Sequence, residues 1–482
     1  MWFKKNSDVW FLGISLIVYL IITLFLSSIK PLWFDELCTF HISQLNIKEI
    51  YNSLGPMDPH PPLDKLFVSI SQSIFGPTKF ATRIPYIIFY LITVAVIFLI
   101  CKKINGSIAA RASSLLILIS PIQFYSYEAR SYGLVLMFSS ILIYLWSKTP
   151  TKRLRNYVQI AIVTMGLISS HFYAVFIPLI IIISSFIIFL KTKKIDLKLW
   201  VSIIIGYLIL IIYIPAIQDI TTLSDNNWAS PVLSRLIKAI KKTYIPFIII
   251  LLPIIVLNWE KCIKKMADLY KQNPAFILSL LILSMLVIIG YPLSFVLGAY
   301  HLRYFVVSSI PIVIISSIIM STISRKHLFI AILFFVSYAP FKVANEVKGF
   351  IDDKTDISIL ENLMEDKPAN AVVFMGDPHK FTMLQKRRSK KDKKDIHYLM
   401  DLDSENKLTN NRATNITLFE LSKLKPGIFV HNINQIAKVD STIYYLDTGT
   451  SRCAKKLLTL QKFKSSKIIK IKNRLKLIEI RP

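Results

Sequence analysis

Two adjacent carboxylates, Asp35 and Glu36, follow the first long apolar stretch of the chain. A deprotonated carboxylate at a membrane surface can take the proton from an acceptor hydroxyl or amine during nucleophilic attack. Partial burial would make it a stronger base, whereas an isolated carboxylate here would only flank a membrane span. Successive residues face different ways, so the two side chains are not expected to share one role. We predict both as catalytic residues, with Asp35 as general base and Glu36 in support.

A second polar segment, Asp58-Pro59-His60-Pro61-Pro62, is stiffened by prolines that fix φ and exclude helix before Leu63. It is either a rigid linker or a means of holding an acid and an imidazole against Asp35. Asp, Glu and His side chains together could also hold a divalent cation, although the sequence establishes neither a metal nor another cofactor. Asp58 and His60 are predicted to bind substrate.

The remaining candidates lie at the ends of apolar stretches, where ionisable side chains are costly unless they are paired or line a polar cavity. Arginine suits a lipid-linked phosphate because its forked guanidinium is always charged. Alternatively, Glu128 and Arg130 form a structural pair, and His171 is a satisfied boundary histidine. The predicted substrate-binding residues of this group are Arg83, Glu128, Arg130, Tyr132, His171, Tyr173, Arg303 and Tyr304. All are expected to converge on Asp35.

Apolar stretches of membrane-spanning length must position these residues. The 482-residue chain is 54% hydrophobic with a mean hydropathy of +0.53, above the range of soluble proteins. A spanning helix needs ~20 mostly apolar residues. The first stretch lacks a small-residue cleavage site and is interpreted as a retained anchor rather than a signal peptide. The sequence predicts about 11 spans at residues 9–29, 80–101, 108–125, 132–147, 157–170, 173–190, 199–217, 244–257, 275–297, 304–323 and 327–341.

The charge distribution orients these spans. The net charge is +29, and much of the Lys and Arg lies in short loops that alternate with less basic ones, as the positive-inside rule requires. Nucleic acid is therefore not needed to explain the charge, and no glycine-rich phosphate loop is present. The N-terminus is predicted to be cytoplasmic and every candidate site residue to lie on the outer face. The outer loop 218–243 fits least well because it carries Lys238, Lys241 and Lys242.

Two further regions are expected to be structured. Apolar residues recur at helical spacing within 47–54 and 63–74, which predicts short helices lying in the membrane plane, the first with an Asn46–Glu49 capping box. Beyond residue 342 the chain is polar, and β-rich runs at 371–375, 428–430, 442–446 and 475–480 predict a small α/β domain. We predict a transmembrane catalytic domain, 1–341, and an extracytoplasmic domain, 342–482. The basic run 381–395 is either a solvated loop or a contact with anionic headgroups.

The order of these motifs resembles that of bacterial glycosyltransferases of family 39. These enzymes belong to the GT-C superfamily and are relatives of protein O-mannosyltransferases and of the lipid A aminoarabinose transferase. The resemblance covers roughly residues 1–340 and is strongest over 30–146. The motifs that carry it are Asp35-Glu36, His60-Pro61-Pro62-Leu63, Arg83-Ile84-Pro85, Tyr127-Glu128-Ala129-Arg130-Ser131-Tyr132 and Arg303-Tyr304.

The resemblance implies a GT-C fold, a polyprenyl-phosphate-linked sugar donor, an active site on the outer face and inverting transfer. Asp35 matches the catalytic aspartate of the family's first loop, and Arg130 and Arg303 are our candidates for the donor phosphate. Two departures separate the chain from aminoarabinose transferases. Glu128-Ala129-Arg130 stands where those enzymes have Leu-Asp-Pro, and His60 replaces a basic residue. These departures favour the broader bacterial branch.

Together these features predict a multi-pass enzyme of the bacterial inner (cytoplasmic) membrane. It would transfer a sugar to an envelope acceptor, whether lipid, glycan or protein, with membrane lipids and no nucleic acid as its other partners. The alternative function is a transporter or flippase for polyprenyl lipids or glycolipids, which would require ionisable residues deep within the spans. A receptor for cell-wall lipids that uses the basic run is a third possibility.

Overall fold

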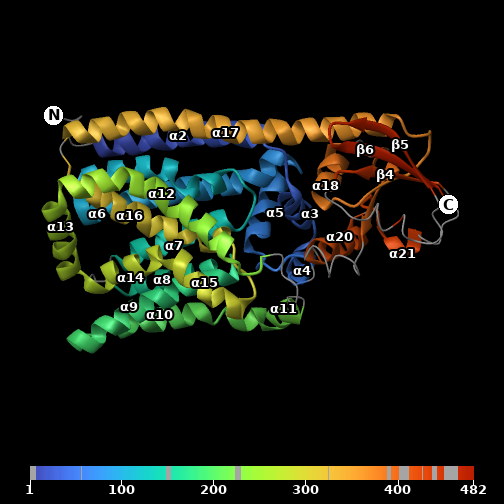
Figure 1. Ribbon diagram of the computed structural model, residues 1–482. Helices are drawn as coiled ribbons and strands as arrows, with labels where there is room; N and C mark the ends of the chain where they lie inside the picture. The colour runs from blue at the N-terminus through green and yellow to red at the C-terminus, as the bar shows by residue number, and fades with distance from the viewer. Residues whose placement is uncertain are drawn as a thin grey trace. The chain divides into compact units, whose positions relative to one another are not determined.

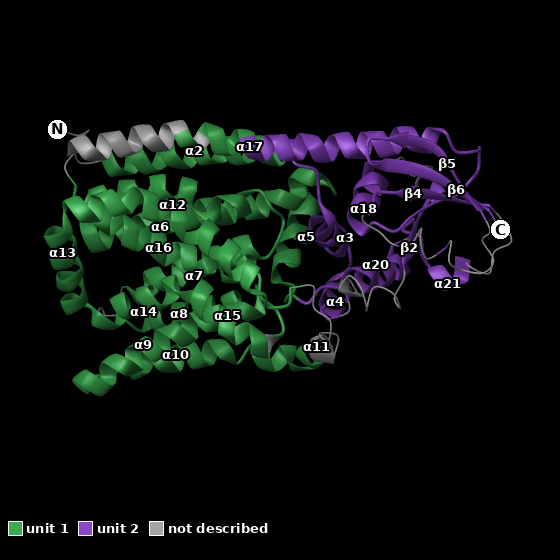
Figure 2. Ribbon diagram, in the orientation of Figure 1, with its two compact units in different colours: residues 1–27, 60–218, 229–344 green, residues 28–59, 219–228, 345–482 purple. Residues whose placement is uncertain are grey.

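The protein forms two compact units, which Figure 2 distinguishes by colour. The computed structural model describes residues 7–55, 57–147, 153–222, 229–323, 325–387, 392–400, 412–425, 427–436, 442–449, 457 and 465–481. Unit 1 comprises Met1–Ser27, His60–Gln218 and Ala229–Ala344. Unit 2 comprises Ser28–Pro59, Asp219–Trp228 and Asn345–Pro482. Unit 2 therefore joins the first loop to the C-terminal part of the chain.

Unit 1 is a bundle of helices (Figure 1). A further helix, α17 (Arg325–Glu365), begins in unit 1 and ends in unit 2. The α-helices that lie wholly or mostly in unit 1 are α2 (Ser7–Ile29), α5 (Leu63–Phe75), α6 (Lys79–Ile119), α7 (Tyr132–Trp146), α8 (Leu154–Ile168), α9 (Phe176–Thr192), α10 (Leu197–Tyr207), α11 (Leu210–Thr222), α12 (Leu233–Leu257), α13 (Trp259–Gln272), α14 (Pro274–Ser284), α15 (Leu286–Leu297) and α16 (Ser309–Met320). Short 3-10 helices join some of them: η1 (Pro121–Ser126), η3 (Phe172–Val175) and η5 (Leu302–Ser308).

The length and apolar character of these helices show an integral multi-pass membrane protein. In the described residues, 5 helices are long and apolar enough to cross a membrane, and up to 7 if each of two bent pairs counts as one span. The bent pairs are Leu197–Tyr207 with Leu210–Gln218, at 43°, and Pro274–Ser284 with Leu286–Val296, at 64°. The predicted count of 11 is not confirmed. One reason is that α7 and α8 have only 15 residues each, fewer than the ~20 that a span requires.

The predicted spans 80–101 and 108–125 meet within α6. Helical geometry fails there at Asn105 and at Gly106, whose φ of 77° is in the left-handed region that glycine adopts without strain. Asp8 of α2 contacts the chain on both sides of this break, at 3.2 Å from Lys102 Nζ and 2.8 Å from Arg111 Nη2. The ion pairs thus hold α2 against both parts of α6.

One predicted boundary in unit 1 is wrong. The span expected at 244–257 begins earlier, because α12 starts at Leu233, so Lys238, Lys241 and Lys242 belong to a helix rather than to a loop. Close packing elsewhere depends on small residues, as is usual between membrane helices. A Cβ on Gly206 of α10 would lie only 2.5 Å from the Thr164 side chain of α8.

Unit 2 is built on a mixed sheet with the strand order β3-β2-β1-β4-β6-β5. The strands β3, β2, β1 and β4 are parallel, whereas β6 is antiparallel to both β4 and β5. The strands are β1 (Val373–Met375), β2 (Ile396–Met400), β3 (Val430–Asn432), β4 (Ile443–Asp447), β5 (Ser465–Lys472) and β6 (Leu475–Arg481). The helices of this unit are α3 (Phe34–Ile42), α4 (Ile47–Asn52), α18 (Pro378–Arg387), α20 (Arg412–Leu424) and α21 (Ile433–Ile436), with η6 (Asp392–Asp395). A β-sheet domain near the C-terminus is confirmed.

The basic run 381–395 differs from the predicted loop. Residues 381–387 lie in α18, where Phe381 and Leu384 are buried, so this part packs into the domain. Lys386 Nζ lies 3.4 Å from the centre of the Phe40 ring, within reach of a cation–π interaction. The remaining basic residues of the run include Arg388, Lys390 and Lys391, which lie outside the described residues.

The helices predicted in the first loop are confirmed as α4 and α5. The Asn46–Glu49 capping box is present: Glu49 N–H donates to Asn46 Oδ1 at 2.9 Å, and Asn46 N–H donates to Glu49 Oε2 at 3.1 Å. In α5, Ile70, Ile74 and Phe75 are exposed. An exposed apolar stripe of this kind is typical of a helix at a membrane surface, and the in-plane orientation of these helices stays a prediction.

A histidine pair connects neighbouring strands of the sheet and carries a pH dependence. His431 Nε2 lies 3.0 Å from His397 Nδ1, and the two rings stack with centroids 4.8 Å apart. Burial, followed by the facing His431, lowers the pKa of His397 to about 4, and burial also lowers the pKa of His431. Both imidazoles are therefore neutral in the fold at neutral pH.

Protonation of this pair should destabilise unit 2 in acid. The unfolded chain takes up protons near pH 6.5, before the folded chain does, so stability is complete above that pH and falls as the pH decreases toward 4. We expect the thermal midpoint to fall over this range, and to fall less in a His397→Gln, His431→Gln double variant. Thermal unfolding of the full chain in detergent across this range measures both slopes, and equal slopes would contradict the assignment.

Candidate functional site

Aromatic and basic side chains predicted to bind substrate come together in unit 1. Arg130 Nη2 lies 3.4 Å from His60 Nδ1. The ring of His60 lies 4.5 Å from that of His171 and 6.2 Å from that of Tyr132. The stack continues through Tyr304, whose ring lies 5.6 Å from His171. We call this group the aromatic–arginine cluster, and its members are His60, Arg130, Tyr132, His171, Tyr173, Arg303 and Tyr304.

Arg303 contacts two tyrosine rings of the cluster. Its guanidinium carbon lies 5.8 Å from the ring of Tyr132 and 5.6 Å from that of Tyr304, a cation–π distance for each. Tyr304 in turn stacks on Tyr173 with ring centroids 4.8 Å apart and an interplanar angle of 25°. The Tyr173 hydroxyl donates to the Ala299 carbonyl at 2.9 Å. These contacts orient the guanidinium over aromatic faces.

A histidine is the N-cap of η3 and of η5, the two 3-10 helices that carry cluster residues. His171 Nδ1 accepts from the Tyr173 N–H at 3.1 Å, and His301 Nδ1 accepts from the Arg303 N–H at 3.2 Å. An Nδ1 that accepts cannot carry a proton, so the neutral ring holds its proton on Nε2. The same device, a histidine bonded to the backbone two residues on, therefore places Tyr173 and Arg303.

The charge around the cluster is positive. Burial, followed by the charges of Arg303, Arg235, Lys242 and Lys238, lowers the pKa of His301 to about 4. Arg235, Lys238 and Lys242 all belong to α12. Lysines that fitted poorly in a predicted outer loop thus add to a positive field at this end of unit 1. Such a field attracts an anionic group.

Glu128 lies two residues before the cluster member Arg130, in a buried turn that precedes α7. Both are almost fully buried, with 4% and 6% of their surfaces exposed. The ring of Tyr125 lies 5.3 Å from that of Tyr132. Arg130 contacts His60, and the alternative of a structural Glu128–Arg130 pair stays open. Tyr125 is a member of this region that was not predicted as a site residue.

Arg83 makes a contact of a different kind. It is completely buried on α6, and its Nη1 donates to the Ser27 carbonyl at 2.7 Å, near the C-terminal end of α2. A cation at that end completes an orphan carbonyl and suits the helix dipole. Two further buried charges were missed by the sequence interpretation, Asp64 and Lys65 at the start of α5, which lie 3.2 Å apart. Tyr86 donates to Asp64 at 2.9 Å.

The two predicted catalytic carboxylates belong to unit 2 and lie in the first turn of α3 (Figure 2). The sequence interpretation placed them in a loop. Trp33 is the N-cap, and Asp35 is half-buried in the helix's positively polarised first turn, which favours a negative charge. Glu36 is completely buried, with Oε2 3.5 Å from Lys30 Nζ and 3.4 Å from the Trp33 backbone nitrogen.

The C-terminal part of unit 2 holds this turn in place. His379 of α18 stacks on Trp33 at 6.3 Å and meets Phe34 edge-on at 5.4 Å. On the next turns, Leu37 and Phe40 pack with Leu32 and Met383. Asp35 is therefore flanked by aromatic residues that α18 fixes.

Asp58 follows a tight turn in the same unit. Gly55 has a φ of 97°, which favours glycine, and its N–H donates to the Asp58 carbonyl at 3.1 Å. Thr417 Oγ1 of α20 donates to the Met57 carbonyl at 2.9 Å, and Asp58 is buried. The chain passes from unit 2 to unit 1 between Pro59 and His60. Among the residues that the structure describes, no group of three or more His, Cys, Asp or Glu side chains is placed to hold a metal ion.

Part of the chain is similar to a known protein family. Residues 59–218 match the family model described as dolichyl-phosphate-mannose-protein mannosyltransferase. The predicted resemblance to this class of glycosyltransferase is confirmed over those residues. They include His60, Arg130, Tyr132, His171 and Tyr173 of the cluster. A search of curated protein sequences finds no significant match.

The fold is similar to that of a solved membrane protein over nearly its whole length. The crystal structure of ArnT from Cupriavidus metallidurans in the apo state has a TM-score of 0.60 at 12% identity. The structure of the same protein bound to undecaprenyl phosphate has a TM-score of 0.57 at 12% identity. Each match covers 99% of this chain and 98% of the other. At this identity the likeness establishes the fold, which confirms an ArnT-like helical membrane protein.

The buried Lys30–Glu36 pair should be essential for the stability of α3. Glu36→Leu leaves the Lys30 ammonium buried without this carboxylate, and loss of one partner of a buried pair costs about 3–5 kcal/mol. The Lys30→Met, Glu36→Leu double variant should recover most of that loss. Denaturant unfolding of the full chain in mild detergent measures the coupling. If the double variant were as unstable as the single one, Lys30 would not be the partner that matters.

Proposed function

We propose that the protein is a glycosyltransferase that takes a sugar from a polyprenyl-phosphate donor and passes it to an envelope acceptor. The observation that carries the proposal is the aromatic–arginine cluster, in which two always-charged guanidinium groups are held among aromatic rings. The family match over residues 59–218 supports a lipid-phosphate-mannose type of donor. The undecaprenyl phosphate in the ArnT structure supports a polyprenyl phosphate.

The donor phosphate is assigned to Arg130 and Arg303. A planar guanidinium can give a phosphate two parallel hydrogen bonds, and the positive field from α12 adds long-range attraction. The phosphate is also the leaving group. Because it is already ionised at neutral pH, departure requires positive charge rather than a general acid. The tyrosine and histidine rings offer apolar faces and N–H or O–H donors to the sugar.

Asp35 is assigned as the general base. Its carboxylate would take the proton from the acceptor hydroxyl or amine as the acceptor oxygen or nitrogen attacks the anomeric carbon. The bond to phosphate breaks on the opposite side, so the configuration inverts. Glu36 has a supporting role, since its bond with Lys30 and the Trp33 N–H fixes the turn that carries Asp35.

The proposal retains the finer features of the predicted membrane arrangement. It includes 11 spans in a catalytic domain over 1–341, an extracytoplasmic domain over 342–482, and an active site on the outer face of the bacterial inner membrane. The break at Asn105-Gly106 supports counting α6 as two spans, because a glycine turn can reverse the chain there.

Substitution of Asp35 separates catalysis from binding. We expect Asp35→Asn to lower the turnover number by about 10²–10⁴-fold, the usual contribution of a positioned base, with donor affinity retained. Labelled polyprenyl-phosphate sugars, the chain in lipid and an outer-envelope extract provide the assay. Asp352→Asn, on an exposed part of α17, is the matched control. Unchanged transfer by Asp35→Asn would refute the base. A transporter would show no sugar transfer with either protein.

Substitution of the cluster arginines should act mainly on donor binding. Each of Arg130→Gln and Arg303→Gln removes charge-assisted hydrogen bonds worth about 1.5–3 kcal/mol, so the donor should bind roughly 10–100-fold more weakly. Arg155→Gln, which removes an exposed arginine of α8, should have no effect. Equilibrium binding of a labelled polyprenyl phosphate tests this. Unchanged affinity in both cluster variants would place the phosphate elsewhere.

A further inference from the structure

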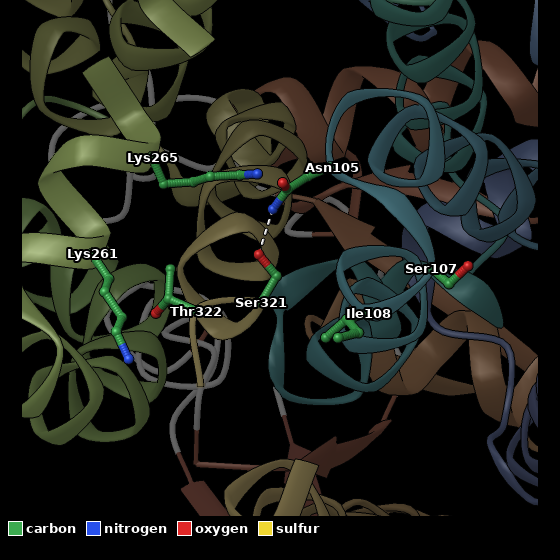
Figure 3. Close-up of a pocket in the computed structure, with 7 residues that line it drawn as sticks. All are labelled: Asn105, Ser107, Ile108, Lys261, Lys265, Ser321 and Thr322. Atoms are coloured by element: carbon green, nitrogen blue, oxygen red, sulfur yellow. Dashed lines mark hydrogen bonds between the residues drawn. The ribbon is translucent and has the colours of Figure 1, made fainter. Parts of the chain in front are cut away.

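A basic pocket lies where α6, α13 and the end of α16 meet in unit 1. It has a volume of about 350 Å³ and is lined by Asn105, Ser107, Ile108, Lys261, Lys265, Ser321 and Thr322. Figure 3 shows the lysines extending from α13, with Asn105 and Ser107 coming from the break in α6. Ser321 and Thr322 follow the last residue of α16, and the Asn105 side chain donates to the Ser321 hydroxyl. The pocket thus joins three helices.

The pocket and the aromatic–arginine cluster are at opposite ends of one apolar helix. Arg303 and Tyr304 open the Leu302–Met320 span, and Ser321 directly follows it. At 1.5–2.0 Å per residue, these 19 residues extend about 30 Å, the thickness of the hydrocarbon core. The pocket therefore belongs to the other surface of the membrane.

The side chains of the pocket suit a phosphate. Lys261 and Lys265 supply ammonium groups, and the lining hydroxyls and carboxamide supply neutral polar groups. The two chain segments that form its walls, 102–111 and 259–265, carry Lys102, Lys103, Arg111, Lys261, Lys264 and Lys265 against a single acid, Glu260. The Asp8 carboxylate, which accepts from the Ser107 hydroxyl at 2.5 Å, is paired with Lys102 and Arg111.

The helix beside the pocket has the character of a membrane-surface element. On α13, Cys262 and Leu269 are buried, whereas Trp259, Ile263 and Tyr270 are 60%, 48% and 38% exposed. The exposed apolar residues and the flanking lysines are typical of a helix in the headgroup region. A soluble phosphate would require no such face, so the apolar residues favour a ligand that is part of the bilayer.

We propose that this pocket binds the phosphate diester of an anionic phospholipid headgroup. Lys261 and Lys265 would contact the phosphate, and the acyl chains would extend from the pocket into the bilayer. Basic pockets between membrane helices bind anionic headgroups in this way. The site is separate from the proposed donor site and would tie the activity of the protein to the charge of the surrounding lipid.

Paired lysine substitutions on α13 test the pocket. The variant Lys261→Ala, Lys265→Ala removes the lining charges, and Lys264→Ala, Lys271→Ala removes the same charge from the same helix outside the pocket. The full chain in nanodiscs of phosphatidylcholine is titrated with fluorescent phosphatidylglycerol. The first variant should bind it on the order of 30-fold more weakly, since each lysine near an anionic lipid contributes about 1 kcal/mol. The second should bind with at most a small change.

The alternatives have distinct outcomes. Equal losses in the two variants would show general attraction by surface charge and would overturn the pocket. Soluble glycerol phosphate is the second arm: it should not displace the labelled lipid, and full displacement would assign the site to a free phosphate instead. All the substituted lysines belong to α13. Unchanged thermal unfolding of each variant would show that folding is intact.

Discussion

The hydrocarbon core of the membrane tolerates charge only where that charge is paired or enclosed, and this constraint organises unit 1. Polar and charged side chains therefore gather at the ends of the long apolar helices. At one end of the Leu302–Met320 span, Arg303 lies over tyrosine rings, and at the other end hydroxyl groups meet the lysines of α13. Among the described residues, Asp64 and Lys65 at the start of α5 show how buried charges are tolerated, as neighbours in contact.

Short, irregular segments of backbone position most side chains of the aromatic–arginine cluster. They come from a proline-rich segment, a turn and two 3-10 helices, and Tyr132 is the first residue of α7. Histidine caps fix both 3-10 helices, and His171 is at the same time a cap and a member of the cluster. The long helices act as the rigid frame on which these segments are held, an arrangement common where loops carry function.

The sequence identified most of the cluster because each member is a polar residue at the end of an apolar run. An ionisable residue in that position is costly unless it is paired or lines a polar cavity. The positive-inside pattern then predicted which ends of the spans share a face of the membrane. The helix α3 was missed because its nine residues show no extended amphipathic pattern, and its packing partners, His379 and Met383, are far away in the chain. Strand β5, Ser465–Lys472, mixes serine, lysine and isoleucine without a regular alternation of polar and apolar residues, so its sequence did not indicate a strand. The span count is not confirmed, because a two-residue break in α6 and several short helices make the length criterion ambiguous.

The packing of the first loop against the C-terminal domain has a consequence for how the protein is made. Trp33 leaves the ribosome early, but its stacking partner His379 is synthesised about 350 residues later, which takes roughly 20–70 s at 5–20 residues per second. Until then the turn that carries Asp35 lacks the surface that holds it. The nascent chain therefore inserts its spans while α3 still lacks its packing partners on α18, and α3 becomes fixed only when the last domain folds.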